Sequence, residues 1–174
     1  NISFEPSIDY VVTKIPRFNF EKFIQTDPVL STQMKSVGEV MAIGRTFQES
    51  LQKAIRGLET GRDGLNPIFN DEDEFETLKQ RISIPSPDRL WFVADGFRKG
   101  LSIEEVFEFS KIDPWFLVQI KDLVDEEINL EKSSLEQLSF DDVLNLKRKG
   151  FSDSRIGNLL KRSEEDVRGF RKSL

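Results

Sequence analysis

The sequence predicts a mainly α-helical protein with a small α/β part at its N-terminal end. An alternating run rich in Val, Ile and Tyr occurs near the start, where it indicates a strand. A Gly-rich segment with turn character follows at residues 57–67. Beyond it, apolar residues recur at helical spacing. We therefore expect two parts, residues 1–65 and residues 66–174, that meet at the Gly-rich segment.

Two strands are expected in the first part. Residues 7–18 alternate between apolar and polar side chains, and Pro16 should place the end of this strand at a sheet edge, because proline donates no ladder hydrogen bond. A second strand is expected near Glu39–Ile43, where Gly38 would let two backbones approach closely.

A helix should follow the second strand. Thr46 and Glu49 have the spacing of a capping box, in which the hydroxyl accepts from a backbone N–H and the carboxylate reaches back. The apolar residues after this start share one helical face. They are Phe47, Leu51, Ala54, Ile55 and Leu58.

The second part should contain about six to eight short helices, given ordinary helix lengths. One is expected from about Asp73 to Ser83. Two more should begin at Ser86-Pro87 and Asp113-Pro114, with proline at the first helical position, where its missing N–H is not needed.

The pattern Ser-x-acid-acid-Val occurs three times, at residues 102–106, 139–143 and 163–167. Each copy places a hydroxyl cap before acidic residues at the positive end of a helix dipole, and then an apolar anchor. Because the spacings between the copies differ, we interpret them as three helix starts rather than as a tandem repeat.

Composition excludes several function classes. With no Cys among 174 residues the chain has no disulfide or thiolate chemistry, which fits the cytosol. With no His it cannot perform imidazole-assisted Ser or Cys catalysis. No apolar run approaches a membrane span, and we expect no signal peptide. The formal charge of −6 should repel nucleic acid and anionic membranes, so we expect a cytoplasmic protein that binds neither.

Several long blocks, in order along nearly the whole chain, resemble the large subunit of glutamine-dependent carbamoyl-phosphate synthase. Residues 66–87 and 122–138 carry no such block. The blocks that carry the resemblance are Phe4–Phe18, Met34–Arg45, Thr46–Ala54, Asp88–Trp91, Ile112–Ile120 and Leu146–Phe151.

The resemblance implies a division of the chain. In that family the large subunit has two homologous ATP-dependent halves, and a helical oligomerisation domain follows the first. Residues 1–65 would then be the C-terminal part of the carboxyphosphate ATP-grasp domain, and residues 66–174 the helical oligomerisation domain. The chain begins with Asn1 rather than Met, and we expect it to be a piece of a longer protein.

The resemblance also implies the function of the complete enzyme. It would make carbamoyl phosphate from bicarbonate, glutamine-derived ammonia and two ATP, for pyrimidine and arginine biosynthesis, with Mg²⁺ or Mn²⁺ beside the nucleotide. The family's catalytic, cofactor-binding and metal-binding residues would all precede Asn1, so none is assigned here, and the chain alone should be inactive. Expected partners are the rest of the large subunit, the glutaminase small subunit and further copies of the chain.

The resemblance places Met34, Lys35, Ser36 and Glu39 close to the interior route taken by the carbamate intermediate. These residues form a polar cluster among Val and Met side chains. A labile anion needs a wall that excludes bulk water, so we predict that they line this tunnel. The alternative is a surface loop in which Lys35 and Glu39 pair with each other.

Phe75, Leu78 and Ile82 share one stripe of the helix expected near residues 73–83. They either face the core of their own domain or form a contact between copies, as an exposed apolar patch would. Both interpretations stay open at this point.

A rival hypothesis is an independent helical adaptor or a helix-turn-helix DNA-binding protein. Residues 147–174 hold nine Lys or Arg against four Asp or Glu, and residues 150–167 have helix-turn-helix rhythm. However, a recognition helix presents its first residues to DNA, and here these are Glu164, Glu165 and Asp166. The enzyme-like blocks near the start of the chain argue against an adaptor.

Paired carboxylates occur at Glu126-Glu127 and between Asp71 and Glu74. They could suggest a metal or acid–base site, but no convergent partner is evident in the sequence. We interpret both groups as solvated surface.

Overall fold

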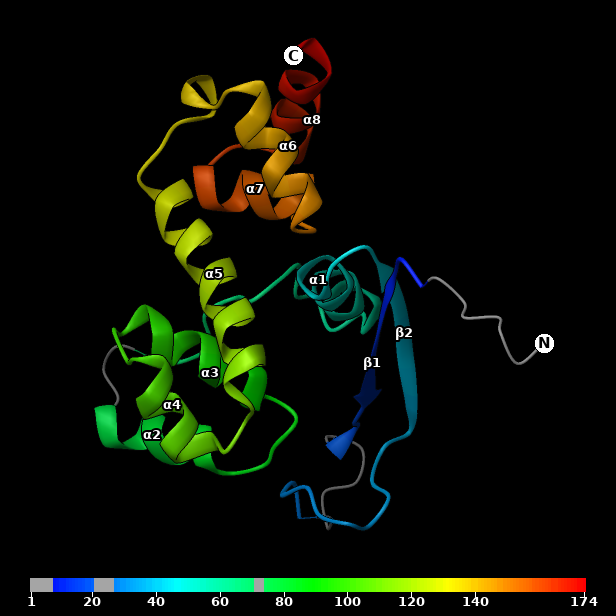
Figure 1. Cartoon of the computed structure of the whole chain (residues 1–174), viewed down its shortest axis with the longest axis vertical. Coiled ribbons are helices and arrows are strands. Elements are labelled where there is room, and N and C mark those ends of the chain that lie inside the picture. Colours follow the sequence, from blue (N-terminus) through cyan, green and yellow to red (C-terminus); the bar gives the residue numbers. More distant parts are fainter. Residues whose placement is uncertain (1–7, 21–26, 71–73) are drawn as a thin grey trace, which may run out of the picture.

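The computed structural model describes residues 8–20, 27–70 and 74–174, and these ranges contain two strands and eight α-helices. The predicted mainly α fold with a small α/β part is confirmed (Figure 1). In chain order the elements are β1 (Val11–Arg17), β2 (Gly38–Gly44), α1 (Phe47–Gly57), α2 (Phe75–Ser83), α3 (Arg89–Arg98), α4 (Ile103–Ser110), α5 (Pro114–Glu131), the 3-10 helix η2 (Leu135–Gln137), α6 (Phe140–Arg148), α7 (Asp153–Leu160) and α8 (Glu164–Ser173).

Both predicted strands are present and pair antiparallel, in a register that runs from Val11 opposite Gly44 to Arg17 opposite Gly38. Helix α1 lies against one face of this sheet, and no other described element lies over the opposite face (Figure 1). Partly buried Ile15 and Val40 join the sheet to the core beneath α1.

The start of α1 is close to the predicted capping box. The Thr46 hydroxyl accepts from the Glu49 N–H at 3.2 Å. The Glu49 carboxylate accepts from the N–H of Arg45 at 2.7 Å, one residue before the expected partner. The predicted apolar face is confirmed: Phe47 is partly buried, and Leu51, Ala54, Ile55 and Leu58 are buried.

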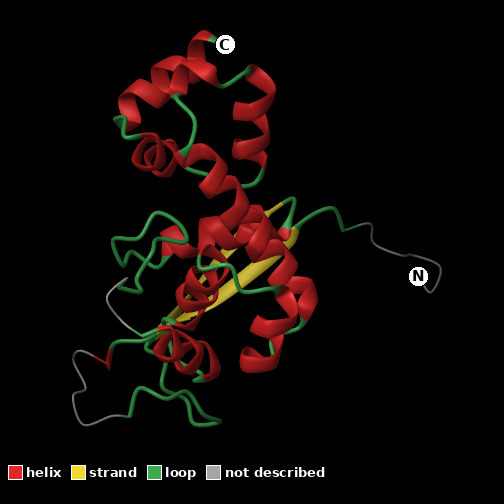
Figure 2. Cartoon of the chain, turned by 90° about the vertical axis from the view of Figure 1, so that its left-hand side faces the viewer, coloured by secondary structure: helices red, strands yellow, loops and turns green. Residues whose placement is uncertain are grey.

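The helices after residue 74 form two lobes joined by α5. The proximal lobe consists of α2, α3 and α4, and the distal lobe consists of α6, α7 and α8. Figure 1 shows α5 running from one lobe to the other, and Figure 2 shows the helices in front of the two strands. The proximal lobe packs on α5 through α3 and α4, and the distal lobe through α7.

All three Ser-x-acid-acid-Val segments begin helices, as predicted. In each, the serine side chain accepts from the backbone N–H three residues later, and the acid at that position accepts from the serine N–H. The three pairs are Ser102 with Glu105, Ser139 with Asp142 and Ser163 with Asp166, and the anchors Val106, Val143 and Val167 are buried.

The two proline predictions have different outcomes. Pro114 is the first residue of α5, and Asp113 accepts from the Trp115 N–H at 2.8 Å, so this start is confirmed. The predicted start at Ser86-Pro87 is wrong, because α3 begins at Arg89. Residues 86–89 form a turn instead, in which the Ser86 carbonyl accepts from the Arg89 N–H at 3.2 Å. The helix expected from about Asp73 begins at Phe75, and Asp73 lies outside the described residues.

The Gly-rich segment contacts both lobes rather than forming an isolated linker. Gly64 and Leu65 are buried, and the Trp91 indole donates to the Gly64 carbonyl at 3.0 Å. Helix α1 also contacts α5. The division at residues 65 and 66 therefore stays a prediction that needs an unfolding or proteolysis experiment.

Candidate functional surfaces

The predicted tunnel residues lie along the loop before β2 and at the start of that strand. Met34 is 86% exposed. Lys35 donates through Nζ to the carbonyls of Asp27 and Val29, at 2.9 and 2.7 Å, and so ties the loop to itself. Ser36 is half-buried.

Glu39 pairs with Lys14 of the neighbouring strand at 3.0 Å, and both side chains are more than half exposed. The alternative in which Lys35 pairs with Glu39 is therefore wrong. Glu39 pairs with Lys14, its diagonal neighbour on β1, and Lys35 donates to loop carbonyls instead. Of the four residues, Met34 and Glu39 are exposed and Lys35 and Ser36 are half-buried. A closed passage would need a second wall from residues beyond those described, so the tunnel role stays a prediction.

The predicted contact stripe on α2 divides in two. Leu78 and Ile82 are both 0% exposed and belong to the core of the proximal lobe. Phe75 is 40% exposed, with the Lys79 ammonium 5.1 Å from its ring centroid. A second copy could therefore reach Phe75 without opening the core, whereas Leu78 and Ile82 offer it no surface.

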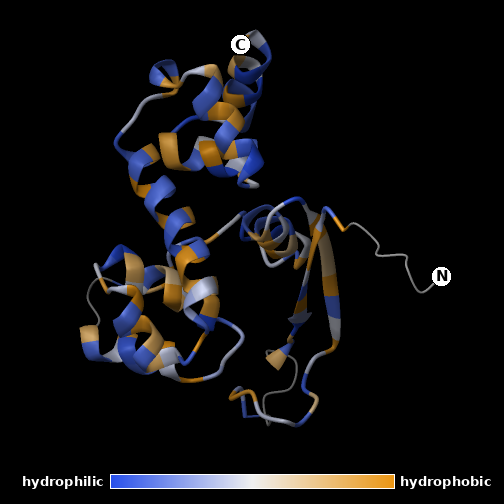
Figure 3. Cartoon of the chain, viewed as in Figure 1, coloured by the Kyte–Doolittle hydropathy of each residue, from blue (hydrophilic) through white to orange (hydrophobic). Residues whose placement is uncertain are grey.

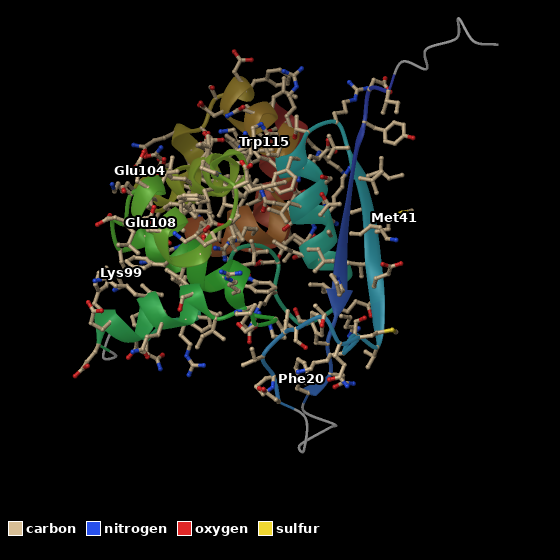
Figure 4. The ribbon with its side chains drawn as sticks, turned by 60° about the horizontal axis from the view of Figure 1, so that its bottom comes forward. Phe20, Met41, Lys99, Glu104, Glu108 and Trp115 are labelled. Atoms are coloured by element: carbon tan, nitrogen blue, oxygen red, sulfur yellow. The ribbon has the colours of Figure 1, made fainter. Side chains whose placement is uncertain are left out.

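The outer face of the sheet is an apolar surface that the sequence analysis did not single out. Val12 of β1 and Met41 and Ile43 of β2 are exposed, as is Tyr10 directly before β1. Figure 3 shows hydrophobic residues along both strands, and Figure 4 shows Met41 on the side of β2 away from the helices. The alternation predicted the strands, but it did not show which face would stay uncovered.

An exposed aromatic cluster joins the starts of α1 and α5. The rings of Phe47, Trp115 and Phe116 contact one another edge to face, with centroids 5.0–5.4 Å apart. Trp115 is 54% exposed. The sequence placed Phe47 on the buried face of α1, but it did not reveal these partners.

Glu127 contradicts the interpretation of the paired carboxylates as solvated surface. It is 2% exposed and accepts from Arg98 at 2.5 Å and from Arg155 at 2.9 Å. Its neighbour Glu126 is one-quarter exposed and pairs with Lys149 at 2.6 Å. Glu74 is exposed, as expected, whereas residues 71–73 lie outside the described part of the chain.

Ion pairs neutralise much of the basic C-terminal segment. Asp153 accepts from Lys147 and from Arg171, each at 2.8 Å. Burial alone would raise the pKa of Asp153, but these two hydrogen bonds outweigh it and hold the pKa below its ordinary value. Burial likewise opposes the charge of Lys149, yet hydrogen bonds from Lys149 to Asp122 and Glu126 raise its pKa.

Six of the nine Lys and Arg residues between 147 and 174 form ion pairs with acidic side chains. They are Lys147, Lys149, Arg155, Arg162, Arg168 and Arg171. This segment therefore offers fewer free cations to DNA phosphates than its composition suggests, which weakens the helix-turn-helix alternative.

Among the described residues, no group of three or more Asp and Glu side chains is placed to hold a metal ion. Within the same ranges, no helix combines the length and apolar character that a membrane crossing requires.

Comparison with known proteins identifies close relatives. The family described as "Carbamoyl-phosphate synthetase large chain, oligomerisation domain" matches residues 39–174. Proteins named carbamoyl phosphate synthase large chain are similar over 99% of this chain: 60% identical over 172 residues in Haemophilus ducreyi, 56% over 174 residues in Pseudomonas aeruginosa and 57% over 172 residues in Neisseria meningitidis. The chain spans 16% of the length of each of these relatives.

Proposed function

Because the chain belongs to the oligomerisation-domain family of carbamoyl-phosphate synthetase large chains, we propose that it serves subunit assembly and scaffolding within such a large chain. The family match over residues 39–174 carries this proposal. It covers all eight described α-helices and β2 from Glu39 onward. The partners would be further copies of the chain, the rest of the large subunit and the glutaminase small subunit.

The similarity to named large chains supports a proposal for the complete protein. It would be an ATP-dependent carbon–nitrogen ligase of the cytoplasm that forms carbamoyl phosphate from bicarbonate, glutamine-derived ammonia and two ATP. ATP and Mg²⁺ or Mn²⁺ would be bound by residues outside this chain, and the product would supply pyrimidine and arginine biosynthesis.

The purified chain is expected to show no ATP turnover, because the residues assigned to that chemistry by the family resemblance lie outside it. Phosphate release in the presence of ATP and Mg²⁺ should equal the protein-free blank. Release that scales with chain concentration would contradict this expectation.

Self-association is the most direct test of the assembly role. Light scattering across a concentration series should show masses above the 20.1 kDa of one chain. Phe75→Glu should lower the association without changing the circular dichroism spectrum, since Phe75 is partly exposed and a charge there can stay in water.

Phe140→Glu is the matched control, because Phe140 is an exposed phenylalanine at the start of a helix in the other lobe. Equal loss of association in both variants would show that the effect is not specific to Phe75, and would contradict its proposed role in the contact between copies. A monomer at every concentration would show that assembly needs other parts of the large chain.

The tunnel proposal can be tested in the complete enzyme. Glu39→Ala should reduce the carbamoyl phosphate formed per glutamine hydrolysed, because an incomplete wall admits water to the labile intermediate. Lys14→Ala is the control, since it breaks the same ion pair but leaves the Glu39 carboxylate in place. Unchanged coupling in Glu39→Ala would exclude the lining role.

A further inference from the structure

We propose that residues 62–69, here called the strap, act with Glu127 as a buried ionic lock that holds the two helical lobes in one relative orientation. Such a lock would act within one copy of the chain, whether or not the chain self-associates.

The connection between the lobes explains why a lock would matter. Helix α5 is 18 residues long, and both lobes pack on it from opposite ends (Figures 1 and 2). A helix with a lobe at each end fixes the separation of the two lobes along the helix axis. It does not by itself fix the rotation of one lobe relative to the other about that axis.

The strap is fastened to the proximal lobe by buried groups of α3. The Asp95 carboxylate, which is 3% exposed, accepts from the backbone N–H groups of Ile68 and Phe69, both at 2.9 Å. Arg98 donates to the Leu65 carbonyl and pairs with Asp95 at 2.7 Å. These bonds satisfy backbone groups that burial would otherwise leave unpaired.

The same strap is fastened to the distal lobe through Asp63. Its carboxylate accepts from Asn158 at 2.7 Å and from Ser154 at 3.2 Å, and both residues lie on α7. The Arg155 guanidinium of α7 lies 3.6 Å from the same carboxylate. The strap is therefore hydrogen-bonded both to α3 of the proximal lobe and to α7 of the distal lobe.

Glu127 of α5 lies between the two attachments. One carboxylate oxygen accepts from Arg98 of the proximal lobe, and the other accepts from Arg155 of the distal lobe. Arg155 is 4% exposed. Rotation of one lobe about α5 would pull a guanidinium away from Glu127 and leave a buried charge without its partner, which is strongly unfavourable. The geometry in which both arginines reach Glu127 is therefore favoured over others.

The absence of Cys from the sequence allows a direct distance measurement. Spin labels would be attached to Glu104→Cys on α4 and Lys172→Cys on α8, two exposed positions outside the network; Glu104 lies at the surface in Figure 4. Pulsed electron spin resonance then reports the distribution of distances between the lobes.

Glu127→Gln keeps the shape of the side chain but removes the charge shared by the two arginines. We expect the distance distribution to broaden about two-fold or more, because the buried charges no longer favour one geometry. Glu126→Gln, a matched change one residue away on the same helix, should leave the distribution narrow, since Glu126 is partly exposed and its partners Lys149 and Asn145 both belong to the distal lobe, so it does not bridge the two lobes.

Asp63→Ala provides a second test that does not depend on the folding of Glu127→Gln. It releases the strap from α7 at a partly exposed carboxylate while the Glu127–Arg155 pair stays intact. A broadened or shifted distribution in either variant, in protein with native circular dichroism, supports the lock. Distributions as narrow as that of the unsubstituted chain in every folded variant would overturn it and assign the orientation to the packing of the lobes on α5 and α1.

Discussion

Ile82→Ala is expected to lower the free energy of unfolding by about 2–5 kcal/mol, the range for emptying a fully buried aliphatic site. Ile82 is 0% exposed, and its Cδ1 atom lies 2.9 Å from the position that a Cβ atom at Gly96 would occupy. Helices α2 and α3 therefore pack through an isoleucine seated on a glycine. Urea unfolding followed by circular dichroism would measure the loss.

A double-mutant cycle tests this packing more sharply. Gly96→Ala alone gains about 0.5–1 kcal/mol of helix preference, but the new methyl group meets Ile82 and, at 3.2 Å, Leu101. With Ile82→Ala the first of these contacts disappears. The double variant should then be more stable than the sum of the single changes predicts, by about 1 kcal/mol or more. Strict additivity would contradict the close approach of the two helices.

The same variants test the stripe on α2 that was predicted for contact between copies. If Leu78 and Ile82 belong to the core, their substitution should lower stability and leave the association of the remaining folded protein unchanged. Phe75→Glu should leave stability unchanged and lower the association. The three residues share one helical spacing, so the sequence alone could not divide them. The division depends on where α3 lies against α2.

The sequence predicted helix starts well because the interactions that make them are local. The Ser102, Ser139 and Ser163 caps each bond to a backbone group three residues away, so their spacing suffices. Pro87 shows the limit of this reasoning. Its sequence resembles that of Pro114, but a hydrogen-bonded turn at residues 86–89 delays the helix by two residues.

The ionic centre could not be predicted from the carboxylates themselves. Glu126 and Glu127 are chemically identical neighbours, and the partners of Glu127 lie 29 and 28 residues away in sequence. One signal was available. Glu127 continues the buried stripe of α5 formed by Leu117, Ile120 and Val124 at helical spacing. A carboxylate at such a position needs a buried cation, so this spacing predicts a basic partner for Glu127.

The candidate surfaces were the least predictable part of the molecule. Both faces of the β1–β2 sheet carry apolar residues, and the outer one is uncovered by any described element. Alternation fixes which residues share a face, but tertiary contacts decide which face is covered. The tunnel role of Glu39 and the contact role of Phe75 depend in the same way on chains or segments beyond these residues.

Gly150→Ala is expected to be among the most damaging single-methyl additions, with a loss of about 2–5 kcal/mol from backbone strain and overpacking together. Gly150 has a φ of 93°, and a Cβ atom there would lie 2.9 Å from Cα and 3.1 Å from the carbonyl oxygen of Glu49. The turn between α6 and α7 thus lies directly on the backbone of α1. Arg56 reinforces this contact by donating to the Gly150 carbonyl at 2.8 Å.

Gly100→Ala is the matched control for this change. Gly100 has a φ of 90° in an equivalent helix-ending turn, but a Cβ atom there meets nothing within 4 Å. Gly100→Ala should lose only the backbone-strain contribution, about 1–2 kcal/mol of the free energy of unfolding. The additional loss in Gly150→Ala then measures the contact with α1. Equal losses would mean that α1 is not held by this turn.

The contact between Gly150 and α1 ties residues before the predicted boundary to the distal lobe. We therefore expect the unsubstituted chain to unfold in one transition. Two separate transitions would show that its two parts are independent.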